Sequence, residues 1–149
     1  MDYLETLRSK LKLKIILILL KGEKRLADLK GELGCATSET TILHVLKEFE
    51  KLQLTTKSGG IYRLSSLGLM EAQISKEYSS AAEAIGAFKD FWFLHDISGV
   101  PSDLLLQIGS LKESKVVKAE NERMDKVHET FLEVILTSKK IQGLSQEVT

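Results

Sequence analysis

The chain has few of the residues from which catalytic and metal centres are built. Cys35 is its single cysteine among 149 residues, so an intramolecular disulfide cannot form, and this usage fits a reducing cytoplasm. His44, His95 and His128 are far apart, and no His, Cys, Asp and Glu set has the spacing of metal ligands. A glycine-rich phosphate loop is missing too. We therefore expect a cytoplasmic protein that is not an enzyme and uses no metal or cofactor.

Long apolar runs are also missing. The run IILILL at residues 15–20 is too short for a secretory signal or a membrane span. Charged KGEKR follows it without a small-residue cleavage site. We expect no membrane partner, and we interpret the run as the buried end of a first helix over residues 3–20, ended by Gly22.

The chain has no excess of charge of either sign, because 21 Lys and Arg balance 21 Asp and Glu. The two halves differ, however. Residues 1–63 hold 12 basic against 8 acidic residues, a net of +4, and residues 64–149 hold 9 against 13, a net of −4. The basic half is the one in which phosphate neutralisation by a nucleic-acid-binding domain is expected.

Residues 37–54, TSETTILHVLKEFEKLQL, have the pattern of an amphipathic helix. Its apolar residues recur every three or four positions and form one stripe: Ile42, Val45, Leu46, Phe49 and Leu52. The opposite side carries a hydroxyl, an imidazole and two ammonium groups, on Thr40, His44, Lys47 and Lys51, together with the apolar Leu43. Thr37 or Ser38 is the expected N-cap. Such a face is able to contact base edges and phosphates.

The segments around this helix favour DNA recognition over an ordinary solvated face. Residues 25–33 form a shorter helical pattern closed by Gly34, which indicates a helix-turn-helix. Residues 54–57 and 61–64 are strand candidates joined through Ser58 and two glycines, which indicates a β-hairpin wing with Lys57 and Arg63 beside its tip. Helices followed by a hairpin in this order predict a winged helix.

Residues 41–49, TILHVLKEF, resemble the recognition helix of arsenic-repressor-type winged-helix regulators. The resemblance implies that Thr41, His44 and Lys47 face DNA. Leu43 stands where that family usually has a small polar residue, and Gln53 where it usually has the glycine that ends the helix.

We predict that Thr40, Thr41, His44 and Lys47 enter the major groove, where a leucine such as Leu43 could contact a thymine methyl group. Phosphate contacts are expected from four further residues: Ser38, Lys51, Lys57 and Arg63.

Beyond the wing, Ser65 or Ser66 can cap a long helix over residues 67–95. Apolar residues alternate steps of three and four as in a coiled-coil seam, at Leu67, Met70, Ile74, Tyr78, Ala81, Ile85, Phe88 and Trp92, with His95 as the last position. At about 1.5 Å per residue this helix exceeds what one small domain covers. We expect this seam to be a homodimer interface, and the alternative is burial under the chain's own second domain.

Four of the nine aromatic residues, Phe88, Phe91, Trp92 and Phe93, lie within six positions. They are core residues in one interpretation and line a ligand pocket in the other. HDISGVP then breaks the helix before Pro101, and Ser102 can cap a short helix that Gly109 ends. Residues 115–119 are a strand candidate, and Asn121 is the expected cap of a last helix with one apolar face: Val127, Phe131, Val134 and Ile135.

Residues 91–111, FWFLHDISGVPSDLLLQIGSL, resemble the middle domain of archaeal regulators grouped with the methanogenesis and filament-formation regulatory proteins. In that family a winged helix precedes the middle domain and a further α/β portion usually follows. The resemblance implies a regulatory role, and it implies that the chain is either a fragment or a short member.

Together the patterns predict a mostly α-helical chain with a small β-hairpin. A winged helix-turn-helix domain is expected at residues 1–65, a long linking and dimerisation helix at 66–97, and a small α+β region, part of a regulatory domain, at 98–149. The predicted function is sequence-specific regulation of transcription by a homodimer on double-stranded DNA, with room for a small-molecule effector in the C-terminal region. The alternative is a winged helix used as a protein-interaction module without specific DNA binding.

Overall fold

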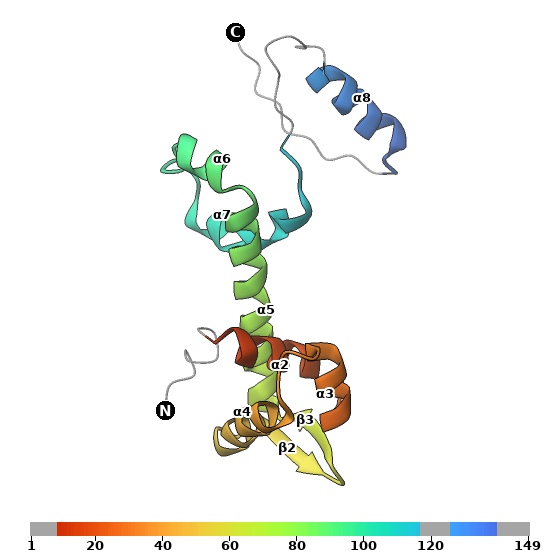
Figure 1. Ribbon diagram of the computed structural model, residues 1–149. Helices are drawn as coiled ribbons and strands as arrows, with labels where there is room; N and C mark the ends of the chain where they lie inside the picture. Colours follow the sequence, from red (N-terminus) through yellow and green to blue (C-terminus); the bar gives the residue numbers. More distant parts are fainter. Residues whose placement is uncertain (1–8, 117–125, 140–149) are drawn as a thin grey trace. The chain divides into compact units, whose positions relative to one another are not determined.

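The computed structural model describes residues 9–116 and 126–139, and its elements begin in the order of a winged helix-turn-helix (Figure 1). These are α2 (Lys10–Leu20), β1 (Lys24–Arg25), α3 (Leu26–Leu33), α4 (Glu39–Lys51), β2 (Thr55–Ser58) and β3 (Ile61–Leu64). The chain continues with α5 (Ser66–Ala87), α6 (Lys89–Leu94), α7 (Ser102–Leu106), the 3-10 helix η1 (Ile108–Glu113) and α8 (Lys126–Thr137). The predicted fold class is confirmed. By contacts the chain divides into two units, Met1–Glu113 and Ser114–Thr149.

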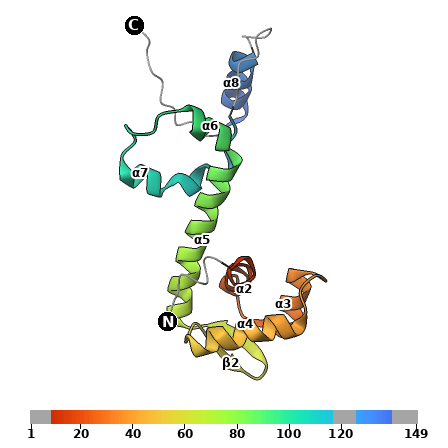
Figure 2. The same cartoon turned by 60° about the vertical axis from the view of Figure 1, so that its left-hand side comes forward.

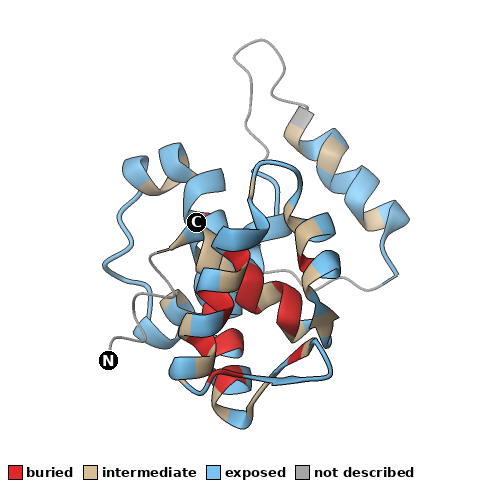
Figure 3. Cartoon of the chain, turned by 60° about the horizontal axis from the view of Figure 1, so that its bottom comes forward, coloured by how far each residue is buried: buried red, intermediate tan, exposed pale blue. Residues whose placement is uncertain are grey.

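The core of the first unit is built from the apolar stripes of its helices (Figure 3). Ile15 and Ile16 of α2 and Leu29 of α3 are fully buried. Four of the five residues of the stripe predicted for α4 are buried as well, with Phe49 fully so, while Leu52 at the C-cap is half-buried. Leu54 and Tyr62 from the hairpin complete this cluster. Burial of these side chains fixes the orientation of α4, because turning the helix would expose them to water.

The first helix begins later than the sequence pattern suggests. Ser9 has an extended backbone, and its hydroxyl accepts the N–H of Lys12 at 3.4 Å, so α2 starts at Lys10. The prediction of one helix over residues 3–20 is therefore wrong at Ser9, and residues 1–8 lie outside the described part. Apolar periodicity continued through Ser9, but a serine that caps a helix ends the helical pattern before it.

The wing is a β-hairpin with a two-residue turn, and a third strand pairs with its edge. β2 and β3 pair antiparallel from Thr55 with Leu64 to Ser58 with Ile61. Gly59 and Gly60 have φ of 56° and 80°, which a two-residue turn of this kind requires at both positions. β1 pairs with the other edge of β3, giving the order β1-β3-β2. The hairpin was predicted, whereas β1 is too short to leave a sequence signal.

The C-terminal end of α4 is a Schellman motif built without glycine. The N–H of Leu54 donates to the carbonyl of Phe49 at 2.8 Å, and the N–H of Gln53 donates to that of Glu50 at 3.0 Å. This pair of bonds requires a left-handed residue between them, and Gln53 has φ of 59°. The hairpin that follows is thus placed directly beside α4 by a backbone conformation that favours glycine.

α5 is fastened to the end of the hairpin by Ser65 and Gly68. The Ser65 hydroxyl accepts the N–H of Gly68 at 3.0 Å and donates to the carbonyl of Gln53 at 2.6 Å. A Cβ at Gly68 would lie 1.9 Å from the carbonyl oxygen of Leu54. Only glycine allows this approach. The N-terminal part of α5 also packs against α2, so this helix belongs to the winged-helix core at one end.

The predicted long helix over residues 67–95 is not continuous. α5 ends at Ala87, Phe88 leaves the helical conformation with φ of −114° and ψ of 29°, and α6 begins at Lys89. The carbonyl of Ala84 accepts both the N–H of Phe88 and, at 3.4 Å, the indole N–H of Trp92. The bend thus lets Trp92 fold back on α5, and side-chain packing at this point overrides a sequence that is compatible with helix throughout.

Two shorter helices close the first unit against α5. α7 begins after Pro101, and η1 packs along α5 at Gly109, where a Cβ would lie 2.9 Å from that of Ser80. Gly109 was expected to end a helix but lies inside η1 instead, because its role is this close approach.

In the second unit α8 is the predicted final helix. Its expected cap Asn121 lies outside the described residues. The expected strand at 115–119 lies mostly outside them too, and its described residues, Lys115 and Val116, are not in a strand.

Candidate DNA-binding surface

α4 presents one polar face to the solvent, opposite its buried stripe. It lies against β2 at one end of the winged-helix part (Figure 2). At about 100° per residue, Thr40, His44, Lys47 and Lys51 lie at the centre of the side opposite Phe49. All four are exposed, and the imidazole of His44 is 74% accessible. Their hydroxyl, imidazole and ammonium groups therefore form one continuous hydrogen-bonding surface.

The N-terminal edge of this face is organised by Ser38. Its hydroxyl oxygen accepts the N–H of Thr41 at 3.1 Å and lies 2.7 Å from the hydroxyl of Thr41. Ser38, one of the two N-caps that the sequence predicted, is thus the N-cap, and Thr41 lies at the edge of the exposed face. Lys30 of α3 donates to the carbonyls of Thr37 and Cys35, the latter at 3.4 Å. These bonds hold the turn of the helix-turn-helix and so set the angle at which α4 is presented.

Glu48 connects the polar face to α2. Its carboxylate lies 2.9 Å from the ammonium of Lys12 and 3.7 Å from Nδ1 of His44, one helical turn before it. The hydrogen bond from Lys12 is the main reason why the pKa of Glu48 lies below its usual value, so the group is ionised at neutral pH. The His44 and Glu48 spacing is visible in the sequence, whereas the Lys12 partner is not.

The two basic residues of the wing differ in what surrounds them. The ammonium of Lys57 lies 5.0 Å from the centre of the Tyr62 ring, its neighbour across the hairpin. The guanidinium of Arg63 lies 3.3 Å from the carboxylate of Glu23, and both side chains are about half exposed. A phosphate would have to compete with Glu23 for Arg63, whereas Lys57 forms no ion pair with a carboxylate in the part of the chain that the structure describes. Lys57 is therefore the stronger phosphate-binding candidate of the wing.

Seven of the nine predicted contact residues lie on α4 or at its N-cap: Ser38, Thr40, Thr41, Leu43, His44, Lys47 and Lys51. Lys57 and Arg63 lie on neighbouring strands of the wing. All are exposed except Leu43, which is half-buried.

The part of the chain that the structure describes contains neither a candidate metal site nor a candidate membrane-spanning helix. No group of three or more His, Cys, Asp or Glu side chains is placed to hold a metal ion within residues 9–116 or 126–139. In the same ranges no helix is long and apolar enough to cross a membrane.

The fold and this surface define the class: a winged helix-turn-helix with an exposed polar second helix and a short wing. The family described as "Methanogenesis regulatory protein FilR1, N-terminal domain" matches residues 4–80, and the chain belongs to this family. A curated relative, the "Methanogenesis regulatory protein FilR1" of Methanothrix harundinacea (strain 6Ac), is 32% identical over 136 residues. The alignment covers 91% of this chain and 30% of the relative, so the chain spans about a third of that protein. No solved structure matches the chain.

The predicted resemblance to the methanogenesis regulators is thus confirmed, and the relative's name as a regulatory protein agrees with a chain that is not an enzyme. The likeness to arsenic-repressor-type recognition helices stays a prediction.

Proposed function

We propose that this chain is a transcriptional regulator that acts in the cytoplasm and binds specific sequences in duplex DNA with α4 in the major groove. The observation that carries the proposal is the exposed polar face of α4, held opposite a buried apolar stripe and beside a wing. A helix of this kind fits the major groove, where each base pair presents a distinct set of donors and acceptors. Membership of a family named for regulation supports the same function.

In this proposal the residues at the centre of the exposed face contact bases. Thr40, His44 and Lys47 present groups that hydrogen-bond base edges, and Leu43 is placed to contact a thymine methyl group. Thr41 is both a base-contact candidate and a partner of the Ser38 cap. Phosphates on either side are held by Ser38, Lys51 and the wing residues Lys57 and Arg63. The modest basic charge makes the phosphate contribution small, so specificity has to come from the groove.

We also propose that the regulator is a homodimer through α5, on a narrower surface than the whole predicted seam. Met70, Ile74 and Tyr78 are 60%, 58% and 51% exposed, and they form an apolar stripe that runs beside the buried residues Glu71 and Ser75. The distal seam residues Phe88 and Trp92 are half-buried within the chain's own fold. A second copy would cover the exposed stripe, and two α4 helices about 34 Å apart would then read a palindromic site.

DNA binding is tested by selecting bound duplexes from a random pool and titrating the selected site by fluorescence anisotropy. Thr40→Ala and His44→Ala should each lower discrimination between sites by about 1–3 kcal/mol per lost base contact. His128→Ala, an exposed histidine of α8, is the matched control and should bind like the unchanged protein. If neither α4 variant changes the site preference, the assignment of the recognition face is wrong.

The exposed apolar stripe of α5 is also what a protein-interaction module would present, and salt distinguishes the two functions. The logarithm of a DNA-binding constant falls linearly with the logarithm of salt concentration, because phosphate contacts release counterions. If no duplex is selected and α5 binds a protein partner with little dependence on salt, the interaction module is correct and the DNA-binding proposal fails.

A further inference from the structure

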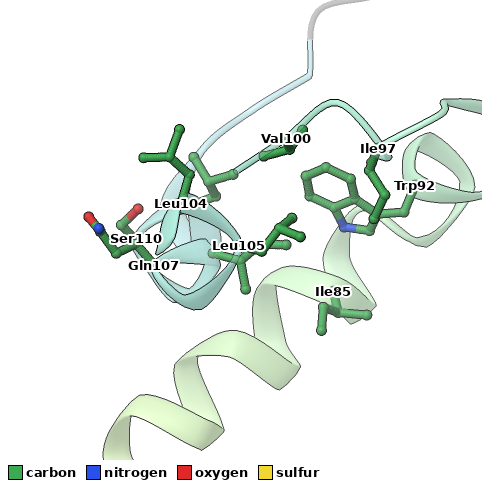
Figure 4. Close-up of a pocket in the computed structure, with 10 residues that line it drawn as sticks. Ile85, Trp92, Ile97, Val100, Leu104, Leu105, Gln107 and Ser110 are labelled. Atoms are coloured by element: carbon green, nitrogen blue, oxygen red, sulfur yellow. The ribbon is translucent and has the colours of Figure 1, made fainter. Parts of the chain in front are cut away.

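A pocket of about 670 Å³ lies at the distal end of α5, away from the surface proposed for DNA (Figure 4). Its lining comes from four helices and one loop. Ile85 belongs to α5 and Trp92 to α6, Ile97 and Val100 come from the loop that follows, and Leu104 and Leu105 belong to α7. η1 contributes the remaining wall. All of these residues belong to the first unit of the chain.

The chemistry of the lining is almost entirely apolar. Eight of the ten lining side chains are aliphatic or aromatic, and the other two are Gln107 and Ser110, neighbours at one side of the pocket (Figure 4). None carries a charge. The indole N–H of Trp92 already donates to the carbonyl of Ala84, so the ring presents apolar surface to the cavity. A charged ligand would lose its hydration here without gaining a partner of opposite charge.

The walls are held in place by contacts outside the cavity. The carboxylate of Asp96 accepts the N–H of Ser98 at 2.8 Å and its hydroxyl at 2.9 Å, and the N–H of Val100 donates to the carbonyl of Ile97 at 3.0 Å. This turn fixes the two loop residues that face the pocket. On the opposite side η1 is brought against α5 at Gly109. The pocket is therefore formed before any ligand arrives, which lowers the entropic cost of binding.

We propose that this pocket binds a neutral, mainly apolar small molecule that carries a hydrogen-bonding group at one end. The apolar body lies against Trp92, Ile85 and the leucines of α7. The polar end meets the hydroxyl of Ser110 and the amide oxygen of Gln107, whose amide nitrogen already donates to the carbonyl of Asp103 at 3.2 Å. The volume falls within the range of about 300–1,000 Å³ that is usual for small-molecule sites. Ten lining residues are too few for a protein partner, which needs about 20–30 residues on each side. None of the lining residues is one of the proposed DNA contacts.

Trp92 is the single tryptophan of the chain, so its fluorescence reports on this pocket alone. N-phenyl-1-naphthylamine is a neutral apolar dye whose absorption overlaps tryptophan emission, and it serves as the probe with the full chain. We expect saturable energy transfer from Trp92 to the dye, with one dye bound per chain. Nonspecific adsorption to exposed apolar residues would instead rise without saturation and would contradict the proposal.

Two aspartate substitutions on the same helix separate the pocket from the general surface. Leu104 lines the pocket and is 53% exposed, whereas Leu106 does not line it and is 86% exposed. Leu104→Asp should weaken dye binding at least tenfold, and Leu106→Asp should leave it unchanged. An equal loss in both variants, or no loss in Leu104→Asp, overturns the proposal. If Leu104→Asp is unfolded by circular dichroism, Val100→Asp, at a second lining residue that is 38% exposed, takes its place and must give the same tenfold loss.

Discussion

Replacing Gln53 with glycine should stabilise the winged-helix unit without touching the polar face of α4. Gln53 has φ of 59°, a conformation that costs a residue with a side chain about 1–2 kcal/mol. Glycine removes that cost but loses roughly 0.5–1 kcal/mol through the greater freedom of the unfolded chain. The side chain of Gln53 is exposed, so little packing is lost. The net gain expected for Gln53→Gly is therefore about 0.5–1 kcal/mol.

Urea unfolding followed by far-ultraviolet circular dichroism measures this gain. With a dependence on urea of about 1–2 kcal/mol per molar, the midpoint should rise by roughly 0.3–1 M. Gln53→Ala is the control, because alanine keeps the Cβ that makes the left-handed conformation costly. Gln53→Ala should not gain stability, and DNA binding of Gln53→Gly should be unchanged. Equal midpoints for the glycine and alanine variants would refute the assignment of strain to Gln53.

Three further changes test other parts of the structure. Burial raises the pKa of Glu71 above its ordinary value of 4.5, so the protonated carboxyl stabilises the fold below pH 4.5 and this contribution is lost as the pH rises through the folded pKa. Glu71→Gln should therefore raise the unfolding midpoint at neutral pH, and Glu77→Gln, at an exposed position, should not. Lys57→Ala should weaken binding to all DNA sequences alike and make the log–log salt slope shallower by about 0.9, so a loss confined to one sequence would contradict a phosphate contact. Ile74→Glu combined with Tyr78→Glu should sediment as a folded monomer and bind DNA weakly, and a persisting dimer would remove α5 as the interface.

The sequence predicted best those features that depend on neighbouring residues. The Ser38 cap, the buried stripe of α4 and the hairpin turn at Gly59 and Gly60 all follow from short spacings, and the structure has each of them. Local chemistry determines such elements, because a hydroxyl before a helix or two glycines between strands act within a few residues of themselves.

The features that sequence reasoning missed depend on residues far apart in the chain. β1 exists because Lys24 and Arg25 meet β3, and nothing within two residues indicates that pairing. Phe88 lies in a helix-compatible stretch, and the helix bends there because Trp92 packs back against α5. Of the four clustered aromatic residues, Trp92 alone lines the pocket. Aliphatic residues from other elements form most of the remaining lining.

α5 contacts the segment that follows α4 at one end and lines the apolar pocket at the other. Near its start Gly68 lies against the carbonyl of Leu54, just after the end of α4, and near its other end Ile85 faces the apolar pocket. The helix is unbroken for 22 residues, about 33 Å, so a rotation or shift at one end is transmitted to the other. Thermodynamic linkage then works in both directions: by whatever factor an occupant of the pocket changes the affinity of α4 for its operator, the operator changes the affinity of the pocket for its occupant by the same factor.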